Sequence, residues 1–236
     1  MSEFTNSPPS RNPADNGSLM GMMRLWRAKM QQQWDDMLPA QVIAYDRASN
    51  RAQVQPLIAM VSTNSTLIDR AQIAALPVLQ LGGGGFVLSF PLQTGDLGWI
   101  KASDRDISLF LQTFQNSPPN TQRMHSFSDA LFIPDTMLRA VSIAGEDAGN
   151  AVFQNTDGTV KIALWDNLIK ILAPQGVGIG GTPSANAILD LQSTTKAFKP
   201  PRMTTAQRNA IAAEEGMVIW NTSVHALQTY NGSTWS

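Results

Sequence analysis

The sequence GTVKIALWDNLIKILAPQGVGIGG, residues 158–181, contains three short segments in which apolar side chains recur at every second position. The apolar positions are Val160, Ile162, Leu164, Ile169, Ile171, Val177 and Ile179. Turn-forming residues, Asp166-Asn167 and Pro174-Gln175-Gly176, separate the three segments. Alternation with a period of two places one apolar row on one face of each strand. The stretch therefore predicts a narrow ribbon of short β-strands.

One copy of this ribbon is expected to be unstable alone. Burial of seven side chains cannot offset the backbone entropy lost when about twenty residues become ordered. Neighbouring strands must supply further hydrogen bonds, and other copies of the chain are their simplest source. We therefore expect an intertwined homotrimeric β-helix or prism over residues 139–182, with the seven apolar side chains on the trimer axis. An antiparallel sheet in a monomeric domain fits the same pattern.

The composition of the 236-residue chain limits the classes of function. Charged residues make up 15% and the formal net charge is −1, so no basic surface for nucleic acid or an anionic bilayer is expected. The absence of cysteine excludes disulfides and thiolate metal sites. No apolar run approaches the roughly 20 residues of a transmembrane helix, and the N-terminus lacks the pattern of a signal peptide. We expect a soluble protein without a secretory signal.

The N-terminal region divides into a polar tail and an amphipathic helix. Residues 1–17 are rich in Pro, Asn and Ser, and are predicted to be extended or disordered. Residues 18–38 are predicted to be helical, with Ser18 as N-cap. Apolar residues form one stripe: Leu19, Met22, Met23, Trp26, Met30, Trp34 and Met37. This stripe either packs on the chain's own domain or docks on another protein, since methionine adapts to irregular interfaces.

The next hundred residues predict a small β-barrel. Strands are expected at residues 40–46, 51–61, 75–81, 86–91 and 97–103, followed by a short helix that begins at Ser103 or Asp104. This order fits an OB-like closed barrel, and we assign residues 39–138 to an OB-fold domain with its connecting loop. Four glycines at 82–85 lack the Lys-Ser/Thr of a phosphate-binding loop and indicate a β-connection. Binding of single-stranded nucleic acid is an alternative role for such a barrel, although its strands carry few lysines.

Two blocks of residues in this region carry a family resemblance. They are Pro91-Leu92, Gly95-Asp96, Gly98 and Asp104-Arg105-Asp106-Ile107, and then Arg123, His125, Ser128-Asp129-Ala130 and Pro134. Over roughly residues 38–138 they resemble the N-terminal OB domain of the membrane-piercing central spike proteins of contractile-tailed bacteriophages. The resemblance implies that the barrel leads into a trimeric β-helix. It also implies that the N-terminal helix lies toward the tail hub.

Several residues of these blocks have the side chains of an acid/base or metal site. They are Asp104, Arg105, Asp106, His125 and Asp129, and Asp96 of the first block belongs with them to the family motif. Catalysis would require a converging cleft and a third partner, which spacing along the chain does not show. The same block is rich in capping and turn residues, with Asp104 at a helix start and Ser126, Ser128 and Asp129 in a loop. We therefore expect a structural role in the barrel connection or in a subunit contact, and no enzyme.

Residues 183–236 form a third type of sequence, beginning with the strand ILDL. Thr204 and Gln207 form a capping box for the helix AQRNAIAA, and MVIWN and ALQTYN predict an antiparallel pair. The segment LDLQSTTKAFKPPRMTTAQRNAI, with the later Trp220, Tyr230 and Trp235, resembles a C-terminal module of phage tail and fibre proteins. These three aromatic residues suit a distal contact with a cell-surface glycan or another tail protein, or a small hydrophobic core. One His225 from each of three chains could hold a tip metal on the axis, but we expect no metal or cofactor.

The sequence thus predicts a mainly β chain with an N-terminal helix, an OB-fold barrel, an intertwined trimeric β-helix or prism and a small α+β C-terminal module. The resemblance implies a structural virion protein made in the host cytoplasm, the homotrimeric central spike at the tip of a tail baseplate. Its implied partners are tail hub or baseplate proteins and the host outer membrane, which it contacts or pierces on tail contraction. A receptor-binding tail fibre or adaptor that uses the C-terminal module is the alternative.

Overall fold

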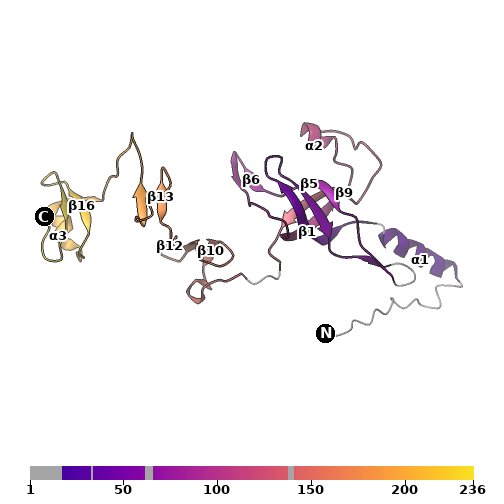
Figure 1. The fold of residues 1–236 in the computed structure, drawn as a ribbon, viewed down its shortest axis with the longest axis horizontal. Helices are drawn as coiled ribbons and strands as arrows, with labels where there is room; N and C mark the ends of the chain where they lie inside the picture. The colour runs from indigo at the N-terminus through magenta and orange to yellow at the C-terminus, as the bar shows by residue number, and fades with distance from the viewer. Residues whose placement is uncertain (1–17, 33, 62–65, 138–140) are drawn as a thin grey trace. The chain divides into compact units, whose positions relative to one another are not determined.

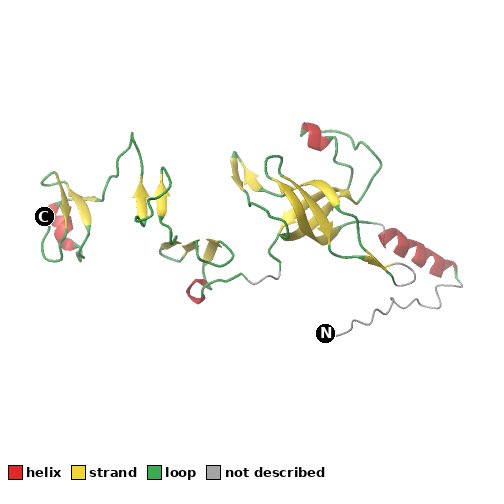
Figure 2. Cartoon of the chain, viewed as in Figure 1, coloured by secondary structure: helices red, strands yellow, loops and turns green. Residues whose placement is uncertain are grey.

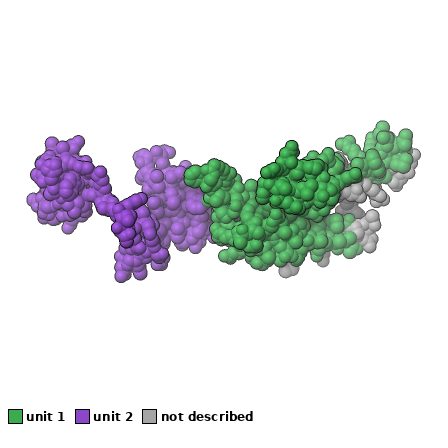
Figure 3. Space-filling model, turned by 90° about the horizontal axis from the view of Figure 1, so that it is seen from above, with its two compact units in different colours: residues 1–140 green, residues 141–236 purple. Residues whose placement is uncertain are grey.

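The computed structural model describes residues 18–32, 34–61, 66–137 and 141–236. The predicted N-terminal tail, residues 1–17, lies outside this range. The chain divides into two compact units, residues 1–140 and 141–236 (Figure 3). Both units are mainly β with few helices, as predicted (Figure 2). No described helix is long and apolar enough to cross a membrane.

The elements of unit 1 are shown in Figure 1. They are α1 (Leu19–Gln32), β1 (Met37–Asp46), β2 (Arg51–Pro56), β3 (Met60–Val61), β4 (Leu67–Ile68), β5 (Ile73–Pro77), β6 (Leu81–Gly83), β7 (Phe86–Leu88), β8 (Leu97–Ser103), α2 (Phe110–Thr113) and β9 (Ser126–Pro134). Five of these strands form one sheet in the order β5-β2-β1-β8-β9. A parallel bridge between Val78 and Phe132 joins its two edges, and Leu79 N donates to Phe132 O at 2.8 Å. The predicted barrel is therefore confirmed as a nearly closed five-stranded sheet.

Alternating side chains fill the barrel. In β2 and β8, the strands on either side of β1, every second residue is buried, which is the pattern expected when one strand face lines a core. The core consists of Ala40, Val42, Ala52, Val54, Leu76, Val78, Ile100, Ala102, Phe127, Ala130 and Phe132. Phe132 is its largest fully buried side chain. Its ring lies against Gly98 of β8, because a side chain larger than that of glycine at this position would occupy the space of the ring.

The fifth barrel strand differs from the prediction. Residues 86–91 were expected to provide it, but β7 pairs with β6 in a separate hairpin, and β9 completes the barrel. Ser126, Ser128 and Asp129, predicted to lie in a loop, belong to β9. Their turn-like character concealed the strand, because its core contacts come from Phe127 and the apolar residues that follow Asp129. The predicted strand 51–61 also divides after Pro56 into β2 and β3.

Both helices of unit 1 are shorter than predicted. The first ends at Gln32, and Met37 and Leu38 already belong to β1, so the helix does not extend to residue 38. The second begins at Phe110 with Leu109 as N-cap, so Asp104 does not cap it. The segment that contains Asp104 is instead held in turns, because Arg123 and His125 of the loop before β9 bind the carboxylates of Asp106 and Asp104.

Unit 2 contains three small sheets. Its elements are a 3₁₀ turn (Gly145–Asp147), β10 (Ala151–Gln154), β11 (Lys161–Leu164), β12 (Ile169–Leu172), β13 (Val177–Ile179), β14 (Leu189–Leu191), β15 (Arg202–Met203), α3 (Thr205–Ala210), β16 (Val218–Asn221) and β17 (Ala226–Thr229). The predicted ribbon forms an antiparallel meander, β10-β11-β12, followed by the parallel pair β13-β14. The capping box of Thr204 and Gln207 and the antiparallel pair β16-β17 are confirmed.

Gly98 offers a test of the barrel core. A Cβ at this position would lie 2.4 Å from Ile133 O and 2.5 Å from Phe132 Cζ. We expect Gly98→Ala to lower the free energy of unfolding of unit 1 by about 1–3 kcal/mol, as overpacking does in other cores. Urea unfolding followed by circular dichroism measures the change. Gly83→Ala, also in unit 1, is the matched control, because no described atom lies within 4 Å of its added methyl group; equal stability of both variants would contradict the prediction.

Candidate functional site

One face of the meander carries only apolar side chains, which we call the ribbon face. Its members are Ala151, Phe153, Ile162, Leu164, Ile169 and Ile171. Strand pairing places Phe153 opposite Ile162, and Ile162 opposite Ile171, so that one row crosses all three strands. In the single chain, Ile162 is 43% exposed and Ile171 56% exposed. A contiguous exposed apolar surface of this kind marks an interaction site.

The opposite face of the meander is closed by a buried ion pair. Lys161 and Asp147 are both almost completely buried, and Lys161 Nζ contacts the Asp147 carboxylate. Trp165 Nε1 donates to Asp147 Oδ1 at 3.0 Å. The hydrogen bond from Lys161, helped by the one from Trp165, lowers the pKa of Asp147, and the same carboxylate raises the pKa of Lys161. The charged side chains of Lys161 and Asp147 are thus buried on one face of the meander, and the apolar side chains of the ribbon face are exposed.

A second ion pair extends this polar face. Lys170 Nζ lies 2.5 Å from Glu146 Oε1, and its ammonium group lies 5.9 Å from the centre of the Trp165 ring. Hydrogen bonding to Lys170 lowers the pKa of Glu146. These contacts join β12 to the turn before β10 and fix which face of the meander points away from the chain.

The pair β13-β14 repeats the arrangement. Val177 lies opposite Leu189, and Ile179 opposite Leu191, so four apolar side chains share one face. Of these, Ile179, Leu189 and Leu191 are exposed. The other face is closed by the loop after β13, because a Cβ at Gly178 would lie 2.2 Å from Gly181 O. The seven residues predicted for the trimer axis lie on or beside these two uncovered faces; Val160 is exposed just before β11, and Val177 is half-buried.

The acidic residues of the family blocks lie in unit 1, where Arg123 brings two of them together. Its Nε and Nη2 bind both oxygens of Asp129, each at 3.1 Å, and Nη2 lies 3.2 Å from Asp106 Oδ2. Both carboxylates are buried. Hydrogen bonds from Ser108 and Thr121, together with the charge of Arg123, hold the pKa of Asp106 far below its usual range. These groups connect β9 with the segment after β8.

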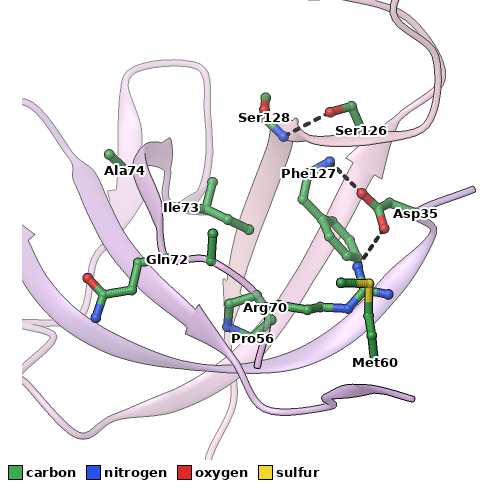
Figure 4. A pocket seen from close by; sticks show the side chains of 11 residues that line it. Asp35, Pro56, Met60, Arg70, Gln72, Ile73, Ala74, Ser126, Phe127 and Ser128 are labelled. Atoms are coloured by element: carbon green, nitrogen blue, oxygen red, sulfur yellow. Dashed lines mark hydrogen bonds and ion pairs between the residues drawn. The ribbon is translucent and has the colours of Figure 1, made fainter. Parts of the chain in front are cut away.

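His125 and its neighbours fasten the approach to β1. The His125 ring stacks on Trp34 with centroids 4.9 Å apart, and its Nε2 lies 3.0 Å from Asp104 Oδ1. Asp35 N donates to His125 O at 2.9 Å. The Asp35 carboxylate accepts hydrogen bonds from Arg70 Nη1 at 2.9 Å and Phe127 N at 3.3 Å (Figure 4). The residues between α1 and the barrel are therefore tied to β9.

A pocket lies beside Asp35, and its wall contains the guanidinium group of Arg70. It has a volume of about 390 Å³, and Arg70, Phe127, Ile73 and Met60 contribute to its wall (Figure 4). The Arg70 guanidinium lies 5.6 Å from the centre of the Phe127 ring while it binds Asp35. The cation is thus already neutralised within the wall.

The other two residues of the predicted set have local roles. Asp96 Oδ2 accepts a hydrogen bond from Gln93 N at 2.8 Å and so closes the turn before β8. Arg105 is exposed, and its Nε lies 3.8 Å from Asp104 Oδ2. The structure therefore assembles Asp106 and Asp129 around one arginine, places Asp104 beside His125, and leaves Asp96 apart. Within the described residues, no group of three or more His, Cys, Asp or Glu is placed to hold a metal ion.

The aromatic residues at the C-terminus pack against their own module. Tyr230 and Trp235 form an isolated β-bridge, with ring centroids 5.3 Å apart, and Arg208 lies 5.9 Å from the Trp235 ring. Trp220 lies in β16 and is half-buried. His225 has a φ of 54° in the turn between β16 and β17.

Three contributors to these sites were not identified from the sequence. Phe153 extends the ribbon face, although alternation in AVFQ at 151–154 could have indicated it. Arg123 was noted only as part of the resemblance, although it is the cation that binds both buried carboxylates. Lys161 alternates with apolar residues, and a lysine in such a position is usually expected to point into solvent. Only the position of Asp147 shows that this lysine is buried.

Comparisons with protein families agree with the two-unit organisation. Residues 38–135 match the family model described as Phage protein Gp138 N-terminal domain, and residues 176–236 match the one described as Phage tail like trimerisation region. The first match covers the barrel, and the second begins next to β13. No curated protein matches the chain. Together the two matches identify a structural protein of a phage tail that carries a trimerisation region.

The buried ion pair predicts how the stability of unit 2 varies with pH. The pKa of Asp147 is lowered from 3.8, so its contribution is present above that value and is lost as the pH falls through the lower folded-state pKa. The pKa of Lys161 is raised from 10.5, so its contribution is present below that value and is lost as the pH rises through the higher folded-state pKa. We expect a melting temperature that is constant from about pH 5 to pH 10 and falls outside this range, measured by circular dichroism.

A double-mutant cycle tests the same pair at neutral pH. Lys161→Met leaves the Asp147 carboxylate buried without its cation, and we expect a large loss of melting temperature. Adding Asp147→Asn removes the unpaired charge and keeps an acceptor for Trp165, so the double variant should recover part of the loss. Equal losses in the single and double variants would contradict a coupled pair.

Proposed function

We propose that the chain is the homotrimeric central spike of a phage tail baseplate, which contacts or pierces the host outer membrane when the tail contracts. The observation that supports this most directly is the uncovered ribbon face, because a sheet whose closed side is polar has its hydrocarbon available for other copies. The match of residues 176–236 to a trimerisation region supports three copies. The proposed role is mechanical, without enzymatic activity or a cofactor.

Three ribbon faces turned toward one threefold axis would form a prism with a continuous apolar interior. Each chain supplies a row of Phe153, Ile162 and Ile171 across its strands, and the pair β13-β14 supplies a further apolar layer. The edge strands of the sheets in one chain can then form backbone hydrogen bonds with the edge strands of its neighbours. Such a shaft resists bending because no sheet edge is left unpaired.

The partner proposed at the N-terminal end is a tail hub or baseplate protein. Met22 and Trp26 of α1 are exposed in the single chain, which favours docking on another protein over packing on the chain's own domain. The helix carries Arg24, Arg27 and Lys29 and no acidic residue. An apolar groove with carboxylates on its rim would complement this helix in both hydrophobicity and charge.

Labelling of phage particles tests the location. An antibody against the chain should bind at the tip of the tail, on its axis, in electron micrographs of particles that carry this protein. Labelling on lateral fibres, combined with adsorption of the purified full chain to host cells, would instead favour the receptor-binding alternative and would exclude the central spike.

Substitution on the ribbon face tests the axis. Ile171→Asp would place three carboxylates together in an apolar interior, where each ion costs several kcal/mol to desolvate. We expect trimer association to weaken by on the order of a thousandfold or more, measured as mass in solution over a range of protein concentrations. Asn167→Asp adds the same charge in the neighbouring exposed turn and should leave the trimer intact. An unchanged Ile171→Asp trimer would show that Ile171 is not on the axis.

A further inference from the structure

A small hairpin of unit 1 has no role in the barrel. Among the described strands, β6 and β7 pair only with each other, with Leu81 opposite Leu88 and Gly83 opposite Phe86. Gly84 and Gly85 connect them, and their positive φ values of 59° and 87° suit the tight turn of a two-residue hairpin. Figure 1 shows the hairpin, labelled at β6, extending beyond the barrel strands. We call residues 81–88 the arm.

The arm presents apolar side chains to its surroundings. Leu81, Phe86 and Leu88 alternate on one face, and Val87 lies on the other. All four are exposed, and Phe86 is 84% exposed. An isolated two-stranded hairpin is marginally stable in water. An ordered arm with this composition therefore needs a surface that covers it.

The surrounding sequence restricts what that surface can be. Between Arg70 and Asp96, all 25 residues lack a charge, and none is Lys, Arg, His, Trp or Tyr. Charged groups are the usual means by which a surface steers and selects a foreign protein. Segments that enter a membrane interface usually carry Trp, Tyr, Lys or Arg at the level of the lipid headgroups. The arm has neither feature.

We propose that the arm packs on the barrel of a neighbouring copy of this chain. The proposal rests on the trimer of the proposed function, since a trimer already holds three barrels close together and no electrostatic selection is needed. A threefold axis relates different surfaces of adjacent copies, so each barrel gives one arm and receives one. The ring of contacts closes after three copies.

The surface that receives the arm must also be apolar and must lie elsewhere on unit 1. Helix α2 offers such a surface, because Phe110 and Phe114 are exposed and contact each other edge to face, with ring centroids 5.8 Å apart. Helix α2 and the arm lie on different parts of unit 1 (Figure 1). They provide the two unlike surfaces that a closed ring of three requires.

Site-specific photocrosslinking of the full chain tests this contact. Because the chain contains no cysteine, Phe86→Cys can be labelled at a single site with a benzophenone maleimide. Irradiation should join neighbouring chains covalently, and mass spectrometry should place the crosslinked residue in unit 1 of the neighbour. Ala48→Cys, in the exposed turn between β1 and β2, is the matched control and should give at least about tenfold less crosslinked product.

The mass of the unirradiated protein separates the possible failures. A trimer in which Phe86→Cys crosslinks no more than Ala48→Cys would overturn the arm contact and leave the proposed function intact. Crosslinks from residue 86 only within its own chain, or only to added lipid vesicles, would likewise overturn it. A monomer would overturn the trimer and the arm contact together.

Discussion

The inward ion pair of Lys161 and Asp147 is the constraint on which the second unit depends. A strand of four residues has two faces, and the chain can close only one of them with the turn that precedes β10. That turn carries carboxylates, so the face it covers must contain the lysine, and alternation then forces Ile162 and Leu164 outward. A buried charge without its partner is costly, whereas an exposed apolar face remains available for contact with another copy of the chain. The polar contact therefore orients the hydrophobic one.

The first unit uses charge in the same way but for a different purpose. Arg123 binds two buried carboxylates, and Asp35 binds Arg70 and the backbone of Phe127. These contacts tie the segments that enter and leave the barrel to β9, the strand that completes it. These carboxylates and arginines, whose side chains are of the kind found in catalytic sites, hold together segments that are distant in the sequence.

Alternation and local capping were sufficient to predict much of the fold. LGWIKAS predicts β8 with the bounds that the structure has, and Thr204 with Gln207 predicts the start of α3, because both signals depend only on neighbours in sequence. The prediction was wrong where a residue's partner lies far along the chain. Asp129 resembles a turn residue until Arg123 binds it, and Phe86 resembles a barrel strand until β9 takes the position that it would have occupied.

The sequence by itself determined that residues 158–181 form short strands with one apolar row, since a period of two is a property of the backbone alone. Only the tertiary structure decided which face the chain covers, because that choice depends on Asp147 meeting Lys161 across a turn. It likewise decided that Phe153 joins the row and that the glycines at 82–85 carry an arm outside the barrel. These outcomes depend on contacts between segments that are distant in the sequence, and the free energies of such contacts cannot be deduced from a local sequence pattern.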